Sequence, residues 1–213
     1  MENDAQRRVR RSPLLFTAPL VLLGALTLIL AWETVRSNVT GDLAEQWPWR
    51  LRLMDMSPLG SLVAVAAAAV LARAQYARTV RPVLGWRASW SLGPLTPHSA
   101  AWTVGILNGG QQHAVIEQVD YQVVLTGGEA RPWYGHAGTQ GELRAVGLEF
   151  GTDYLLELYA PGFPLAGGSG TVQTGLFTRR FVERVDALRM RVRVVDSVGD
   201  SHERVMDLMR GAR

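Results

Sequence analysis

Two uncharged apolar runs occupy the first third of the chain, and short alternating segments fill most of the rest. From Ser12 to Trp32 no residue carries a charge, and as a helix the run PLLFTAPLVLLGALTLILAW can span about 30 Å of hydrocarbon. A cleaved signal peptide is the alternative, but the apolar part is long for one and no A-x-A site follows it. We therefore predict a retained transmembrane helix over residues 13–32.

The second run, MSPLGSLVAVAAAAVLA over residues 56–72, is at the short end of the spanning range. A buried or surface helix is the alternative, but Pro58 suits a first helical turn. Small residues also recur four apart on one face, at Gly60, Ala64, Ala68 and Ala72. This pattern lets membrane helices approach closely. The first run has a similar stripe at Thr17, Gly24 and Ala31. We predict a second transmembrane helix over residues 56–73, and a helical hairpin or a dimer through these faces.

The arginines that flank the two runs predict the orientation of the anchor. Their excess lies before the first run and after the second, at Arg7, Arg8, Arg10, Arg11, Arg73, Arg78, Arg81 and Arg87. The positive-inside rule then places the basic N-terminus (1–12), the linker (74–86) and the folded domain (87–213) in the cytoplasm, with the loop 33–55 outside. The interfacial belt of such an anchor would contain Trp32, Trp47 and Trp49. If residues 56–72 do not span, the folded domain lies on the other side.

The rest of the chain has the pattern of a β domain. AVIEQVDYQVVL (114–125) has mostly period-two spacing, and further strand candidates lie at 87–92, 100–108, 152–160 and 187–196. Gly-Gly pairs mark turns between them. GELRAVGLEFG (141–151) fits a short helix or a strand with a turn, and TRRFVERVDA (178–187) is equally ambiguous. Several short strands with glycine-rich turns predict a mainly β fold, a β-sandwich with a small β-barrel as the alternative.

Two turns of this domain carry a resemblance to a group of proteins. Asn108-Gly109-Gly110, followed by Ala114 and VIEQVDYQV, resembles a turn and strand of bacterial membrane-anchored proteins from high-GC, actinobacterial-like genomes. The ending VRVVDSVGDSHERV resembles their strand, Asp turn, Gly and strand hairpin. The resemblance covers roughly residues 85–210 and departs at His113, where Pro or a small residue is more usual. It implies one or two helices followed by an immunoglobulin-like module, and it brings no assigned chemistry.

Composition narrows the functional classes. The absence of cysteine excludes disulfides and thiolate sites, and all 22 basic residues are arginine. A net charge of +3 is too small to indicate nucleic-acid binding, so we do not expect nucleic acid as a partner. The four histidines (His98, His113, His136 and His202) have no metal-site spacing, and no nucleotide or hydrolase motif is present. We therefore expect no enzyme, cofactor or metal.

The most distinct surface feature is an arginine ladder in LRMRVRVVDSVGD (188–200). In a strand, Arg189, Arg191 and Arg193 share one face, and Arg179 and Arg180 can extend the patch. A plain solvated face with acidic cross-strand neighbours is the favoured interpretation. Docking to anionic lipid headgroups or an acidic partner comes second, and contact with a ligand or nucleic acid third. The loop RPWYGHAG (131–138) is a candidate ligand loop through Arg131, Trp133 and Tyr134, or it caps the core.

The sequence supports two functional hypotheses from different classes. The first is a membrane-anchored, non-enzymatic interaction or scaffold protein with a cytoplasmic β-sandwich, an unknown protein partner, and possible homo-oligomers through the membrane helices. The second is a membrane-disrupting sensor-effector, whose layout resembles bacterial anti-phage proteins that bind a cyclic nucleotide. A deep pocket lined by arginines and aromatics would favour the second, and a tight sandwich without a cavity would oppose it.

Overall fold

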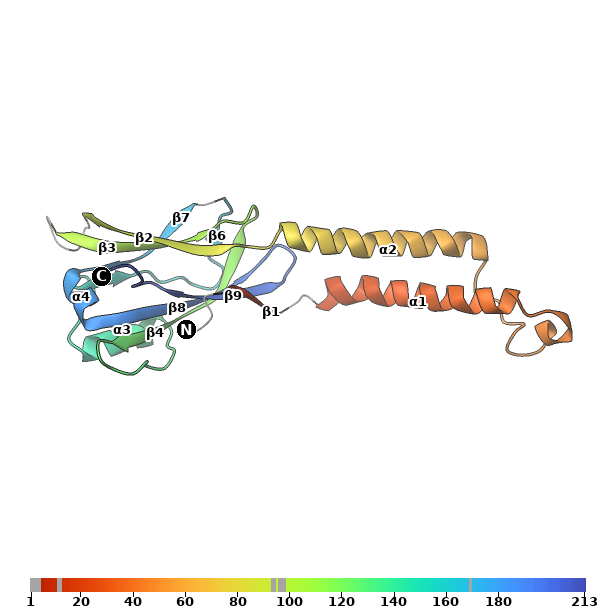
Figure 1. Cartoon of the computed structure of the whole chain (residues 1–213), viewed down its shortest axis with the longest axis horizontal. Helices are drawn as coiled ribbons and strands as arrows, with labels where there is room; N and C mark the ends of the chain where they lie inside the picture. Colours follow the sequence, from red (N-terminus) through yellow and green to blue (C-terminus); the bar gives the residue numbers. More distant parts are fainter. Residues whose placement is uncertain (1–4, 11–12, 93–94, 96–98, 169) are drawn as a thin grey trace. The chain divides into compact units, whose positions relative to one another are not determined.

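The protein divides into two compact units along its chain. The computed structural model describes residues 5–10, 13–92, 95, 99–168 and 170–213 (Figure 1). One unit contains residues 1–11 together with 80–213, and the other contains residues 12–79. The chain therefore starts in the first unit, leaves it to form the second, and then returns to the first.

The second unit is helical. It consists of α1 (Pro13–Ser37), a short 3-10 helix η1 (Gly41–Glu45) and α2 (Met56–Thr79). The segments Thr17–Ser37 and Met56–Thr79 are long and apolar enough to cross a membrane. Both helices continue past the predicted spans of 13–32 and 56–73, by about one turn or more. The predicted linker 74–86 is accordingly part helix and part strand.

Large apolar side chains make the contact between the two helices. Leu26 of α1 is buried with Leu59 and Ala66 of α2, and partly buried leucine, isoleucine and valine residues surround them. The small residues that the sequence singled out do not line this contact, since Gly60, Ala64, Ala68 and Ala72 are all exposed. The same holds for Thr17, Gly24 and Ala31. Within the hairpin, α2 thus turns its leucine and valine face toward α1 and leaves its small-residue stripe open.

A buried carboxylate fixes the loop between the helices. The side chain of Glu33 near the end of α1 is 0% exposed and accepts hydrogen bonds from the backbone N–H of Leu53 (2.6 Å) and Met54 (3.3 Å). The Arg36 guanidinium pairs with its other oxygen at 2.8 Å. The indole ring of Trp32 stacks on that of Trp49 with 5.5 Å between centroids. These contacts bring the chain back to the start of α2.

The first unit contains two antiparallel sheets, which form two layers in Figure 1. One sheet has the order β1-β9-β8-β4-β6 and the other β2-β3-β7-β5. Their strands are β1 (Arg7–Arg10), β2 (Leu84–Leu92), β3 (Ala100–Asn108), β4 (Ala114–Leu125), β5 (Tyr154–Leu156), β6 (Pro164–Leu165), β7 (Thr171–Phe177), β8 (Val185–Val195) and β9 (Ser201–Asp207). Two short helices, α3 (His136–Ala145) and α4 (Arg179–Arg184), complete the unit. The predicted sheet-rich fold with two apolar helices is confirmed, and neither sheet of the described residues closes into a barrel.

A single hydrophobic core lies between the sheets and explains the alternation in the sequence. On β8 the residues Leu188, Met190, Val192 and Val194 are buried, and the residues between them are half-exposed. The other sheet contributes Leu84, Trp102, Val104 and Ile106 to the same core. The period-two spacing of β8 therefore reflects one buried and one wetted face.

Several local predictions differ from the structure. Residues 178–187 form helix α4 and then the start of β8, because the Thr178 side chain caps the helix by accepting the Phe181 N–H. The ambiguous segment 141–151 contains the end of α3, and the candidate strand 152–160 shortens to β5. Strand β7 was not predicted. Residues 7–10 of the predicted basic N-terminus form β1, whereas residues 1–4, 11 and 12 lie outside the described residues.

Asn108 organises the turn between β3 and β4. Its side chain is fully buried, and its Oδ1 accepts hydrogen bonds from the backbone N–H of Val83 (3.1 Å) and Gly110 (3.0 Å). Its Nδ2 donates to the carbonyl oxygen of Gln112 at 2.8 Å. A Cβ at Gly110 would lie 2.8 Å from the Arg81 carbonyl oxygen, so only glycine fits beside this hub. The Asn-Gly-Gly motif is therefore a packing requirement of the turn.

The first unit, residues 1–11 with 80–213, is called the β unit from here on. Replacing Asn108 by alanine is expected to destabilise the β unit by about 2–3 kcal/mol, because several buried backbone groups lose their partner. The measurement is urea unfolding followed by tryptophan fluorescence. Gln111→Ala, at an exposed position in the same turn, is the matched control and should change stability by less than about 0.5 kcal/mol. Equal effects of the two variants would contradict the role given to Asn108.

Candidate functional site

The predicted arginine ladder lies on the half-exposed face of β8, between β4 and β9. Arg191 stands opposite Asp120 of β4, and its Nη2 lies 2.7 Å from the carboxylate. The same guanidinium stacks over the Trp133 ring, 4.7 Å from its centroid. One arginine of the ladder therefore already has an anionic partner and an aromatic partner within the chain.

Arg193 shares a carboxylate with the N-terminal strand. Its Nη2 lies 2.8 Å from Glu203 Oε2, and Arg7 Nη2 of β1 lies 2.6 Å from Glu203 Oε1. The Glu203 side chain is only 2% exposed. Burial by itself raises the pKa of the Glu203 carboxyl, but the hydrogen bonds from Arg193 and Arg7 outweigh burial and hold the pKa below its ordinary value. Glu203 is thus an ionised carboxylate enclosed by two arginines.

Arg189 completes the ladder in the same way. It stands between Gln122 of β4 and Asp207 of β9, and its Nη1 donates to Gln122 Oε1 at 3.1 Å. Burial raises the pKa of the Asp207 carboxyl, although the Met209 N–H and the Arg189 charge act in the opposite direction. Each arginine of the ladder therefore faces a polar or acidic cross-strand neighbour, the arrangement expected of a solvated sheet face.

The candidate ligand loop joins this face. Tyr134 exchanges two backbone hydrogen bonds with Tyr121 of β4, at 2.7 and 2.9 Å, and Arg131 N–H donates to the Val123 carbonyl oxygen at 2.9 Å. The loop therefore runs along β4 like a short extra strand. This pairing brings Trp133 to Arg191, so the structure unites two features that the sequence presented separately. Neither residue lines the two hollows described below.

Arg179 and Arg180 belong to α4 and have other neighbours. Arg180 Nη1 lies 3.1 Å from Asp153 Oδ1, and Arg179 lies over the Trp90 ring, 5.4 Å from its centroid. Both arginines line a hollow of about 510 Å³ together with the hydroxyl side chains of Ser99, Thr152 and Thr178. Part of the cationic charge in this hollow is already balanced by Asp153.

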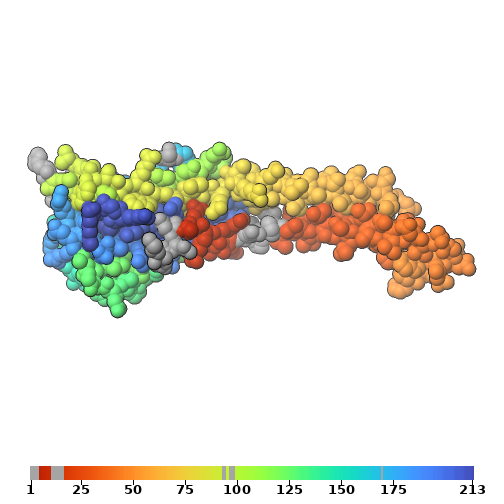
Figure 2. All heavy atoms as spheres, in the orientation of Figure 1, coloured from red at the N-terminus to blue at the C-terminus, as the bar shows by residue number. Residues whose placement is uncertain are grey.

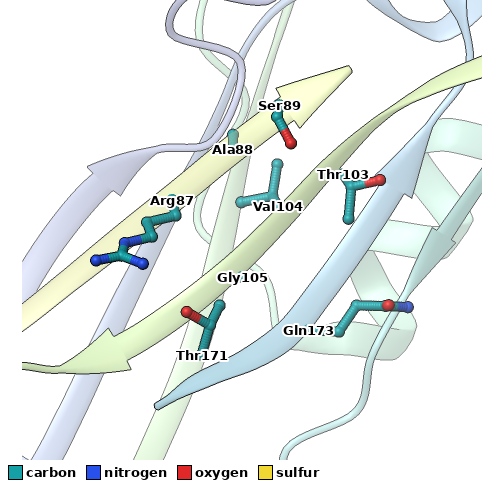
Figure 3. Close-up of a pocket in the computed structure, with 8 residues that line it drawn as sticks. All are labelled: Arg87, Ala88, Ser89, Thr103, Val104, Gly105, Thr171 and Gln173. Carbon is teal, nitrogen blue, oxygen red and sulfur yellow. The ribbon is translucent and has the colours of Figure 1, made fainter. Parts of the chain in front are cut away.

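A second hollow, of about 590 Å³, lies on the outer face of the second sheet (Figure 3). Its floor is Gly105 of β3, where a Cβ would collide with the Thr171 methyl group. Polar side chains of three strands surround this floor, namely Arg87, Ser89, Thr103, Thr171 and Gln173. Sequence reasoning missed it because these residues come from three separate segments. The only signal was the alternation of polar residues in 87–91.

The histidines and the Asp-Ser-Val-Gly-Asp turn hold no metal site among the described residues. Asp196 Oδ1 accepts the N–H groups of Val198 (3.0 Å) and Asp200 (2.9 Å), which closes the turn between β8 and β9. Its Oδ2 lies 2.9 Å from His202 Nε2, and both side chains are buried. His136 Nε2 contacts the Leu156 carbonyl oxygen, and His98 lies outside the described residues. These polar groups serve the hairpin and the core.

Comparison with known proteins adds little. No known protein family matches the chain. No curated protein matches it either. One solved structure, described as the X-ray structure of Northeast Structural Genomics Consortium target SoR45, aligns over 61% of this chain and 83% of that chain, with 15% identity and a TM-score of 0.23. A likeness this slight carries no information about fold or activity.

Glu203→Gln is expected to destabilise the first unit by about 2 kcal/mol at pH 7, because two arginines lose their shared anion. The sign of the pH dependence follows from the lowered pKa of Glu203. Its contribution to stability is fully present above the pKa of an unfolded glutamate, about 4.3, and is lost as the pH falls through the lower folded value. Stability of the unaltered protein should therefore fall more steeply below pH ~4.3 than that of the variant.

The measurement is urea unfolding over a pH series. Glu129→Gln is the matched control, because Glu129 is exposed and forms no ion pair with an arginine among the residues that the structure describes. It should leave both stability and its pH dependence unchanged. An unaltered pH profile in Glu203→Gln would show that the carboxylate is not held by Arg7 and Arg193.

Proposed function

We propose that this chain is a membrane-anchored, non-enzymatic interaction protein. In this proposal α1 and α2 form a hairpin in the cytoplasmic membrane, and the β unit is a cytoplasmic module that binds other proteins. The immunoglobulin-like character suggested by the resemblance belongs to the proposal as well. Its support is the pair of antiparallel sheets around one core.

The observation that carries the proposal is the pairing of β1 with β9. Arg7 stands opposite Glu203, and Arg8 stands opposite His202. Strand β1 precedes both apolar helices and β9 follows both, yet they belong to one sheet. A chain that enters and leaves the helical unit from the same folded domain must cross a membrane twice or not at all. Because a single crossing would put β1 and β9 on opposite sides of the membrane, their pairing favours a hairpin over a single span.

The charge distribution supports the cytoplasmic side. Arginines lie before α1 and at the end of α2. The loop between the helices contains Asp42, Glu45 and Asp55 beside its arginines. By the positive-inside rule, this distribution favours a loop outside the membrane and a β unit inside. The apolar surface of the helices supports insertion, since Leu22, Leu28, Val65 and Leu71 are exposed within the helical unit.

An interaction role has more support than ligand sensing or lipid docking. Arg191 and Arg193 pair with the carboxylates of Asp120 and Glu203, so two of the three ladder charges face an anion within the sheet. Arg189 donates to the neutral Gln122 side chain. Arg131 Nε lies 3.7 Å from Glu142 Oε2 and the Trp133 ring stacks on Arg191, so these loop side chains already have partners within the chain. The sensor hypothesis needs those side chains in a pocket, and the lipid hypothesis needs uncompensated arginines.

Self-association through the membrane helices remains part of the proposal. The stripe of Gly60, Ala64, Ala68 and Ala72 faces away from α1 and stays exposed. It therefore suits a contact with a helix of a second copy better than the contact within the hairpin.

Cysteine mapping tests the topology directly, because the chain has no cysteine of its own. Single substitutions Ala5→Cys, Leu43→Cys and Glu129→Cys place one thiol at the N-terminus, in the loop and in the β unit. All three positions are exposed. In intact cells a membrane-impermeant maleimide should label only the loop position.

Permeabilised cells provide the control, since all three thiols should then react. Labelling of Ala5→Cys and Glu129→Cys on opposite sides would contradict the β1–β9 pairing. Labelling of all three positions in intact cells would place the β unit outside, and labelling of none would show that the helices do not cross.

A further inference from the structure

The four sheet edges of the β unit differ in how they are protected. Strand β5 has 3 residues, and β6 has 2 residues including Pro164. Strand β1 has 4 residues, three of them arginine. Short length, proline and charge are the usual means of preventing a sheet edge from pairing with another chain. Strand β2 has none of these protections over its 9 residues, apart from the single charge of Arg87.

Among the residues that the structure describes, the outward backbone groups of β2 have no hydrogen-bond partner after its first residue. The Leu84 N–H donates to Gln6 Oε1 at 2.9 Å, and the Leu84 carbonyl oxygen accepts from Arg204 Nη1, so Leu84 points its backbone groups away from β3. In an antiparallel pair every second residue does so. The next outward residues are therefore Trp86, Ala88 and Trp90. Among the described residues no hydrogen bond occupies their backbone groups outside the pairing with β3.

The arginines beside this edge also lack a carboxylate partner within the described part of the chain. Arg87 is exposed at the rim of the outer hollow, and Arg179 contacts the Trp90 ring. Neither arginine forms an ion pair with a described residue. This contrasts with the ladder, where Arg191 and Arg193 pair with carboxylates of neighbouring strands. Opposite Arg87 the sheet offers only Gly105.

We propose that the β2 edge is a strand-accepting site for an extended acidic segment of a partner protein. The segment would add a strand beside Trp86–Trp90 and hydrogen-bond to the three outward residues. Its side chains would alternate, with Asp or Glu on the outer face near Arg87 and apolar residues on the inner face beside the two half-buried tryptophans. Figure 2 shows β2 (yellow) at the surface of the β unit.

A second copy of this chain fits the site less well. The β2 sequence LGWRASWSL contains no acidic residue. Two copies paired through β2 in antiparallel fashion would leave both Arg87 side chains without an anion and place like charges on the same face. The proposal deepens the interaction role given above, but it does not depend on the membrane topology, so binding and cysteine mapping can fail separately.

The test uses the full chain in detergent micelles and a fluorescent heptapeptide, Thr-Val-Glu-Val-Glu-Val-Thr with blocked ends, followed by fluorescence anisotropy. We expect saturable binding that weakens about tenfold with Ala88→Pro, since proline removes one outward N–H and blocks the edge. The Ala88 N–H does not serve the pairing with β3, so the sheet should stay folded. A peptide N-methylated at alternate residues should bind to the unaltered protein about as weakly, because it lacks the N–H groups that would pair with β2.

Charge is tested separately. Arg87→Gln, or a peptide with Gln in place of Glu, should weaken binding about threefold, which is the range of a cross-strand ion pair. Arg144→Gln is the matched control, because Arg144 is exposed on α3 of the other side of the domain. It should leave binding unchanged.

Four outcomes would overturn the proposal. They are an absence of peptide binding, equal binding to Ala88→Pro, equal binding of the Glu and Gln peptides, and a dimer of the unliganded chain linked through Ser89→Cys. The last would assign the edge to a second copy.

Discussion

Glu203 joins three strands of the β unit through one buried carboxylate. Arg7 of β1 and Arg193 of β8 both donate to it, and the residues of the first pair lie 196 positions apart in the sequence. A buried carboxylate is stable only when it is paired and hydrogen-bonded, so β1 is part of what makes Glu203 acceptable in the sheet. The closed path of the chain, from β1 through both helices and back to β9, depends on this contact. So does the proposed crossing of the membrane by the two helices as a pair.

Much of the fold could be predicted, because burial leaves a regular trace in the sequence. The two long apolar runs predicted α1 and α2. The alternation of Val192 and Val194 with arginine predicted β8, because one face of that strand is buried and the other is wet. Strand β1 left no such trace, since RRVR has the composition of a membrane flank. Its identity as a strand comes from acids at the far end of the chain. Helix α4 was ambiguous because it has only 6 residues and begins at one capping hydrogen bond, which the Thr178 hydroxyl accepts from the Phe181 N–H.

The candidate sites show a different limit of sequence reasoning. A cluster of arginines attracts attention, but its chemistry depends on cross-strand register. The register places Asp120 against Arg191 and Glu203 against Arg193, which balances the cluster. It places Gly105 against Arg87, which leaves an isolated arginine open. Arg87, which the sequence presented only as a flanking charge, thus faces no carboxylate on the neighbouring strand. Only the pairing of the strands could reveal this difference from the ladder.

The distance between β1 and β9 also has a consequence for biosynthesis. Strand β1 leaves the ribosome before both helices, and β9 leaves it after them. Throughout translation of the proposed anchor, Arg7 and Arg8 therefore have neither Glu203 nor Asp200 to pair with. In the proposed topology they are unpaired with these carboxylates while α1 inserts, the stage at which flanking positive charge determines orientation. The same two side chains pair with carboxylates once β9 is made, so under the proposed topology one short segment would first direct insertion and afterwards complete a sheet.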